Sequence, residues 1–185
     1  MPNIEVTQRI IIVVFVYSDA VHGWRLWVES RPRKSEGVIL PVYLEWVEQP
    51  SEQDWIDLEK LYKETPAQWF DELNVDSVQG YVALHQGSQP SKLAAGRFND
   101  RLLTTARLNA VEAGYEISQL CVRSVTRQRG VAHQMMIRLT QWADEQACSL
   151  MVQDSASELS TLITKLKDYG FSLDGDTWKR PPQGV

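Results

Sequence analysis

Apolar and polar positions alternate along much of the middle of the chain, which predicts short strands with one buried face. A weakly alternating run at 42–47 comes first. From Gly80 onward, four runs joined by turn-forming residues predict an antiparallel meander: 81–85, 93–98, 101–109 and 115–122. In "RFNDRLL" the two residues between strands form a tight hairpin loop, and Asn99 suits a positive φ there.

Helical spacing of apolar residues marks the other segments. Ser51 begins a capping box, with its hydroxyl placed to accept from the Asp54 amide, and the helix should end before Pro66. A second short helix is predicted at 67–73. The remaining elements are helices at 130–146 and 157–169, the latter closed by Gly170, and strands at 150–153, 171–173 and 177–180.

This order of elements predicts an α+β fold, a mixed and mainly antiparallel sheet flanked by helices in one domain. We expect an N-terminal extension at 1–39, the domain at 40–180 and a tail at 181–185. The apolar run Ile10–Tyr17 is too short to span a membrane. It could add an edge strand, the extension could be poorly ordered, or the start codon could lie upstream.

Charge and cysteine content argue against several functional classes. A formal charge of −5 argues against a general nucleic-acid binder or a protein of anionic membranes. A secretory signal is disfavoured because Glu5 and a single Arg9 precede the apolar run, although Ser18 and Ala20 have cleavage-site spacing. Two cysteines without a CxxC pair indicate a reducing, cytoplasmic protein with no structural zinc, and we expect Cys121 and Cys148 to be small buried residues.

Three arginines are concentrated between the last strand of the meander and the helix that follows. Arg123, Arg127 and Arg129 lie just before Gly130, at a predicted helix N-terminus. Unpaired N–H groups and the helix dipole favour a phosphate there, and glycine allows close approach to the backbone. The segment therefore predicts a diphosphate site, with a solvated basic helix cap as the alternative.

The same segment resembles a known motif. Arg127-x-x-Gly130-x-Ala132 matches the [QR]-x-x-G-x-[GA] pyrophosphate loop of the GCN5-related N-acetyltransferase (GNAT) superfamily, and "KLKDYGF" resembles its Gly-Phe helix ending. More specifically, "SEQDWIDLEKLY", "RFNDRLLTTARL" and "LCVRSVTRQRGVAHQ" resemble the aspartate decarboxylase maturation factor family (PanM, also called PanZ) over residues 40–180. The segment 62–92 is longer than expected for that family, and residues 1–39 have no counterpart in it.

This resemblance implies a protein that binds coenzyme A or acetyl-CoA. Such a protein associates with pro-aspartate 1-decarboxylase, promotes its self-cleavage and inhibits the mature enzyme. The resemblance places Arg97 and Asn99 where the ligand and partner surfaces meet. It assigns the pantetheine arm to Leu120, Cys121 and Val122, and the pyrophosphate to Thr126, Arg127, Gln128, Arg129, Gly130, Val131, Ala132 and His133.

The sequence favours a regulator over an acetyltransferase. Many GNAT enzymes carry, four residues before the glycine of the Gly-Phe ending, a tyrosine that protonates the departing thiolate, and here that position is Leu166. Tyr169 should point from a different face of the same helix. As a general base, Glu116 competes with a solvent-facing role on its strand, and His133 is expected to line the coenzyme or cap the helix. Acetyl transfer to an amine is the alternative function.

Overall fold

The computed structural model describes residues 39–65, 68–71, 73–87, 90–153 and 165–184, together with two short strands near the N-terminus. These are β1 (Phe15–Val16) and β2 (Arg25–Leu26), which pair antiparallel in a sheet of their own. Apart from these four residues and Ile39, the predicted extension lies outside the described part. What was predicted for its order, its start and a secretory signal therefore stays a prediction.

A seven-stranded sheet forms the centre of the fold, in the order β3-β4-β5-β6-β7-β9-β8. All neighbouring strands are antiparallel except β6 and β7, which are parallel, so the predicted mixed and mainly antiparallel sheet is confirmed. The strands are β3 (Tyr43–Trp46), β4 (Ser91–Phe98), β5 (Arg101–Val111), β6 (Gly114–Val122), β7 (Ser149–Gln153), β8 (Ser172–Asp174) and β9 (Thr177–Arg180).

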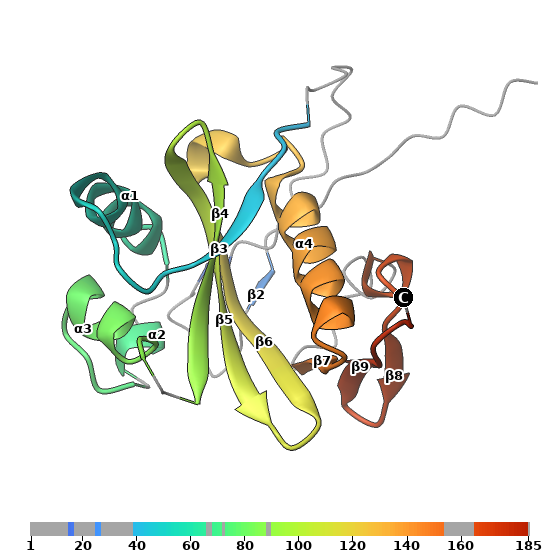
Figure 1. The fold of residues 1–185 in the computed structure, drawn as a ribbon. Coiled ribbons are helices and arrows are strands. Elements are labelled where there is room, and N and C mark those ends of the chain that lie inside the picture. The colour runs from blue at the N-terminus through green and yellow to red at the C-terminus, as the bar shows by residue number, and fades with distance from the viewer. Residues whose placement is uncertain are drawn as a thin grey trace, which may run out of the picture.

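The helices cover both faces of the sheet, with α1, α2 and α3 on one side and α4 on the other (Figure 1). They are α1 (Glu52–Tyr62), α2 (Gln68–Asp71), α3 (Val78–Ala83) and α4 (Val131–Glu145), and a 3-10 helix spans Ser124–Thr126. Of the helix predicted at 157–169, residues 165–168 are described and helical, and 157–164 lie outside the described part. Gly170 closes this helix with a φ of 84°, as predicted.

The predicted capping box starts α1. The Ser51 hydroxyl accepts from the Asp54 amide at 3.2 Å, and the Asp54 carboxylate accepts from the Ser51 amide at 2.9 Å. The helix ends at Tyr62, before Pro66, as its sequence required.

The strand predicted at 81–85 is wrong, because these residues belong to α3 and the turn after it. The Ser77 side chain caps this helix by accepting from the Gly80 amide at 3.1 Å. Tyr81 and Val82 are both buried, and one face of a short helix can bury two neighbours that a strand would place on opposite faces. The edge strand of the meander is instead β3, which pairs with β4.

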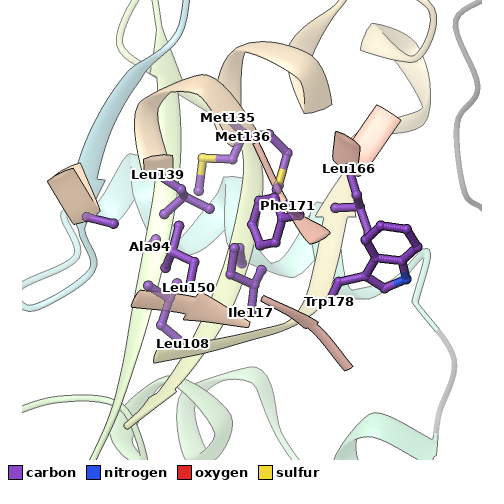
Figure 2. Close-up of a cluster of buried hydrophobic side chains, with 12 residues drawn as sticks. Ala94, Leu108, Ile117, Met135, Met136, Leu139, Leu150, Leu166, Phe171 and Trp178 are labelled. Atoms are coloured by element: carbon purple, nitrogen blue, oxygen red, sulfur yellow. The ribbon is translucent and has the colours of Figure 1, made fainter. Parts of the chain in front are cut away.

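Two hydrophobic layers hold the helices to the sheet. Figure 2 shows the layer under α4, where Met135, Met136 and Leu139 meet Ala94, Leu108 and Ile117 of the sheet, and Leu166, Phe171 and Trp178 of the C-terminal segment close it. The second layer joins α1 and α3 to the opposite face through Leu58, Leu61, Tyr62, Tyr81, Leu93, Ala95, Leu102 and Cys121. Burial of each large apolar side chain contributes about 2 kcal/mol, so both layers fix the sheet from which the site projects.

Candidate functional site

A β-bulge interrupts the pairing of β5 with β6. The register shifts between Thr105 and Arg107 of β5, and Gln119 and Leu120 of β6 together face the one residue between them. Gln119 has a φ of 51°, and its side-chain oxygen accepts a hydrogen bond from the Tyr81 hydroxyl at 2.7 Å. A bulge bends its strand and ends regular pairing, which turns the second half of β6 away from its neighbour.

Beyond this bulge, one edge of β6 is open. The strand pairs with β7 only over residues 114–116, and in the described part of the chain residues 117–122 have no strand beside them on that edge. The three residues that the resemblance assigns to the pantetheine arm lie on this open half: Leu120, Cys121 and Val122. An open strand edge presents N–H and C=O groups to an extended ligand.

The loop after β6 leads directly into the N-terminus of α4. Gly130 is the N-cap residue with a φ of 71°, and Gln128 also has a positive φ of 67°. The first hydrogen bond of the helix runs from the Gln134 amide to the Gly130 carbonyl at 2.9 Å. The amides before it have no intrahelical acceptor and belong to Val131, Ala132 and His133. These three donors and the positive end of the helix dipole lie at the position where the sequence predicts an anion site.

Position 130 favours glycine. A Cβ atom there would lie 3.1 Å from the Cγ2 atom of Ile39, and the positive φ would strain any L-residue. Ile39 is held beside the loop because the Leu40 amide donates to the Arg129 carbonyl at 3.1 Å. The chain entering β3 therefore supports one side of the loop and leaves the amides of α4 on the other.

Two of the three arginines of the loop face carboxylates of α1 and the residues just after it. The Arg127 Nη2 atom lies 3.2 Å from Glu64 Oε2, and the Arg123 Nη1 atom lies 3.7 Å from Asp57 Oδ1. Arg129 is exposed and makes no ion pair with any described residue. The repulsion expected among three neighbouring guanidinium groups is thus largely relieved within the protein, and Arg129 is the cation most accessible to an anion.

Glu64 is a contact that sequence reasoning missed. Its carboxylate accepts from both the amide and the hydroxyl of Ser124 at 2.8 Å, as well as from Arg127. It fixes the start of the loop against the end of α1. The two residues are 60 positions apart, so no local pattern in the sequence could have indicated the pair.

Asp57 joins α1 to both β5 and the loop. Its side chain is fully buried, and its carboxylate accepts from Arg101 Nε at 2.8 Å and from the Leu102 amide at 3.2 Å. Burial alone would raise the pKa of Asp57, but the hydrogen bonds from Arg101 and Leu102 and the charge of Arg123 outweigh it and lower the pKa. The ionised carboxylate therefore ties three segments together.

The β4–β5 hairpin carries the two residues predicted to form a partner surface. Asn99 is exposed at the tip with a φ of 46°, which confirms the predicted tight turn. Arg97 is held from both sides, by Glu45 at 2.6 Å and by Asp54 at 2.7 Å. The hairpin thus presents Asn99 outward on a base fixed to α1 and β3.

The side chains of Cys121 and Thr126 are both occupied within the protein. Cys121 is buried as expected, and burial raises the pKa of its thiol to about 12, which favours the protonated form. Its carbonyl accepts from Thr104 Oγ1 at 2.6 Å. The Thr126 hydroxyl is used within the loop, donating to the Arg123 carbonyl at 3.0 Å. Cys148 is only half-buried, which departs from the expectation for it.

His133 and Tyr169 meet beside the first turn of α4. The Tyr169 hydroxyl lies 2.6 Å from His133 Nδ1, whereas Leu166 points into the core and is 3% exposed. Burial raises the pKa of Tyr169 to about 12, and burial together with Lys165 lowers the pKa of His133. Leu166 and Tyr169 thus point from different faces of their helix, as predicted. The contact between Tyr169 and His133 was not predicted.

The chain also matches a family of known proteins. The model of the PanZ acetyltransferase (GNAT) domain matches residues 41–179 of the chain. The chain belongs to this family. Among its relatives is the PanD regulatory factor of Escherichia coli strain K12, which is 26% identical over 135 residues, covering 72% of this chain and 94% of the relative.

Solved structures confirm the GNAT fold of this family member. The solution structure of YhhK from E. coli bound to coenzyme A has a TM-score of 0.54 and 22% identity, covering 77% of this chain and 99% of YhhK. A GNAT-family crystal structure from Desulfovibrio desulfuricans has a TM-score of 0.55 and 13% identity, covering 76% and 100%.

The described residues contain neither a metal-binding cluster nor a membrane-spanning helix. Across the described residues, no group of three or more His, Cys, Asp and Glu side chains is placed to hold a metal ion. Within the same part of the chain, no helix combines the length and apolar character needed to cross a bilayer.

Proposed function

We propose that this protein is a coenzyme A- or acetyl-CoA-binding regulator of aspartate 1-decarboxylase. It promotes the self-cleavage of the pro-enzyme and controls the mature enzyme, within the cytoplasmic pathway to pantothenate and coenzyme A. The observation that carries the proposal is the open edge of β6, which is joined by the loop at 123–130 to the amides at the start of α4. The family match and the name of the PanD regulatory factor support the choice of partner.

The residues of the site fit this ligand. The main chain of Leu120, Cys121 and Val122 would lie along the extended pantetheine arm, although the carbonyls of Cys121 and Val122 already accept from Thr104 and Arg127. The amides of 131–133 would bind the diphosphate. Arg129 would add a charge-assisted hydrogen bond, while Arg127 stays partly neutralised by Glu64. The buried thiol of Cys121 would stay apart from the coenzyme's own thiol.

The ion pairs of α1 supply a physical route between ligand and partner surfaces. Asp54 holds Arg97 beneath the hairpin tip, and Asp57 holds Arg101 and also faces Arg123 at the start of the loop. A partner that binds the ligand-bound form more tightly than the free form will associate in proportion to the coenzyme concentration. The supply of coenzyme would then control the enzyme at the start of its own pathway.

The hairpin tip gives a direct test of the partner surface. We expect Asn99→Gly to weaken the complex with aspartate 1-decarboxylase about tenfold or more, because it removes one interfacial hydrogen-bonding side chain. Glycine accepts the positive φ of 46°, so the turn itself is retained. The measurement is a titration of the decarboxylase in saturating acetyl-CoA.

The neighbouring tip residue provides the control. Asp100 has a φ of 57°, so Asp100→Gly also keeps the turn while it removes a different exposed side chain. Unchanged affinity in the Asn99 variant, or equal losses in both variants, would show that Asn99 has no specific role.

Acetyl transfer is the second candidate function, favoured by the Tyr169 hydroxyl beside the loop. We nevertheless expect no efficient transfer, because the buried Leu166 occupies the position of the usual proton donor and the high pKa of Tyr169 makes it a poor one. A screen of polyamines, amino acids and peptides with acetyl-CoA, followed by free-thiol release, checks this. Rapid, saturable release that Tyr169→Phe abolishes would establish the enzyme instead.

A further inference from the structure

A second polar cluster lies on the face of the sheet that α1 and α3 cover, at the end away from the coenzyme loop. Two rows of cross-strand partners form it, one of Ser91, Asn109 and Glu116 and the other of Arg107 and Ser118. Across the strands, Asn109 donates to Ser118 Oγ at 3.3 Å. In the next row Thr105 and Cys121 continue the hydrophobic layer, so the polar rows mark where this core ends.

His85 covers these rows from the end of α3. It is 4% exposed, its Nδ1 atom lies 2.7 Å from Ser91 Oγ, and its ring packs edge-on against Tyr81. Ser91 Oγ donates in turn to the Leu84 carbonyl at 3.4 Å, so it accepts from a protonated Nδ1. The second ring nitrogen, Nε2, is then left as an acceptor. Burial, together with Arg107, lowers the pKa of His85 to about 4, which keeps the ring neutral.

Three buried polar atoms of this cluster have no hydrogen-bond partner among the described residues. They are His85 Nε2, Asn109 Oδ1 and Arg107 Nε. The first two are acceptors and the third is a donor that carries part of a positive charge. Leaving such groups unpaired is costly, which indicates that a group other than the described residues satisfies them.

Arg107 also lacks a counter-charge. Arg107 is half-buried, and its guanidinium has no carboxylate within ion-pair distance in the described part, not even Glu116 on the same face. The other arginines of this side of the sheet, Arg97, Arg101, Arg123 and Arg127, each lie within 4.0 Å of an Asp or Glu oxygen. Arg107 is the exception among these arginines, and a bound oxyanion would supply the missing counter-charge.

We propose that His85, Arg107 and Asn109 bind a small organic acid that also carries an N–H or O–H donor, such as an amino acid or a hydroxy acid. The carboxylate of this ligand accepts from Arg107, and its donor group reaches His85 Nε2 and Asn109 Oδ1. This site is separate from the helix N-terminus that holds the coenzyme in the proposed function, and it does not depend on that function.

Titration of the ¹⁵N-labelled full chain without coenzyme tests the site. The probes are L-alanine, L-lactate and propionate, which differ only in carrying an ammonium, a hydroxyl or a hydrogen on the α carbon. The readouts are the Arg107 Nε–H and the Asn109 side-chain amide resonances. We expect saturable shifts, with a midpoint for L-alanine or L-lactate about tenfold or more below that of propionate, because propionate leaves the two acceptors unpaired.

Variants assign the binding to the cluster. Arg107→Gln and Asn109→Ala should each raise the midpoint about tenfold or more, read at whichever side-chain resonance remains. Arg138→Gln, on α4 at the other face of the sheet, should leave it unchanged. A well-dispersed spectrum of each variant shows that it is folded.

Three results would overturn the inference. The first is that no acid produces a saturable shift. An NOE from the Arg107 Nε–H to a long-lived water would then show that water alone occupies the cluster. The second is that the three acids bind equally well. The third is that folded Arg107→Gln and Asn109→Ala both bind like the unaltered protein.

Discussion

Gly130→Asp is expected to abolish acetyl-CoA binding in calorimetric titration, a loss on the order of 100-fold or more in affinity. The new carboxylate would stand at the start of α4, where it would compete with and repel the diphosphate. Its Cβ atom would also displace Ile39, which lies 3.1 Å away, in a backbone with a φ of 71°. The unaltered protein should give saturable heat with acetyl-CoA.

Gly87→Asp is the matched control for this variant. Gly87 has a φ of 70°, and nothing lies within 4 Å of a Cβ atom added there. Gly87→Asp therefore adds the same charge at a glycine of similar positive φ, away from the loop. If Gly130→Asp and Gly87→Asp bind acetyl-CoA equally well, or if the unaltered protein gives neither heat nor a thermal shift at millimolar ligand, the coenzyme site is wrongly assigned.

Asp57→Asn should destabilise the protein by about 3 kcal/mol, which a urea titration at pH 7 would record as a lower midpoint. The substitution removes the only buried carboxylate between Arg101 and Arg123 among the described residues, and it leaves the Leu102 amide facing a poorer acceptor. We take the low end of the range for a broken buried pair because the Arg101 side chain is 40% exposed.

The pH dependence of this difference follows from the lowered pKa of Asp57. An ionised Asp57 stabilises the fold above the pKa of the unfolded chain, about 3.9, and this contribution is lost as the pH falls through the lower pKa of the folded state. The difference in unfolding free energy between the unaltered protein and Asp57→Asn should therefore be largest near pH 7 and should narrow below about pH 4. Asp174→Asn, which breaks an exposed pair with Lys179, should leave the urea midpoint unchanged. Equal midpoints for the Asp57 and Asp174 variants would contradict the role given to Asp57.

Local signals in the sequence were sufficient for the elements that carry the coenzyme loop. The Ser51 capping box, the Asn99 turn and the glycine before α4 each depend on neighbours within a few positions, and the structure has all three. The spacing around Gly130 also led to the correct family, because the motif fixes a strand, a loop and a helix at once.

Contacts between distant segments could not be predicted in this way. The α3 helix was mistaken for a strand because its apolar stretch is too short to distinguish the two periods. The bulge at Gln119, the Glu64 contact with Ser124 and the approach of Tyr169 to His133 all depend on how the sheet and helices pack. The residues of the candidate site could be predicted from the sequence. Which of their polar groups are already bonded within the protein depends on packing and could not.

Arg97 illustrates the same distinction at the proposed partner surface. The resemblance placed it where ligand and partner meet, and the structure shows its guanidinium bound by Glu45 and Asp54. Its first effect is to hold the hairpin against α1, so a substitution there would disturb the support of Asn99 as well as any contact with the decarboxylase. Asn99, which makes no such internal contact among the described residues, is the cleaner probe.

Self-cleavage of the pro-decarboxylase is the measurement that tests the central claim most directly. Purified pro-aspartate 1-decarboxylase from the same source is incubated with this protein, with acetyl-CoA, with both and with neither, and chain cleavage is followed on a denaturing gel. The proposed function predicts acceleration only when both are present, and loss of that acceleration with Gly130→Asp. Cleavage at the same rate in all four incubations, with no complex at any coenzyme concentration, would contradict the regulator assignment even if acetyl-CoA binds.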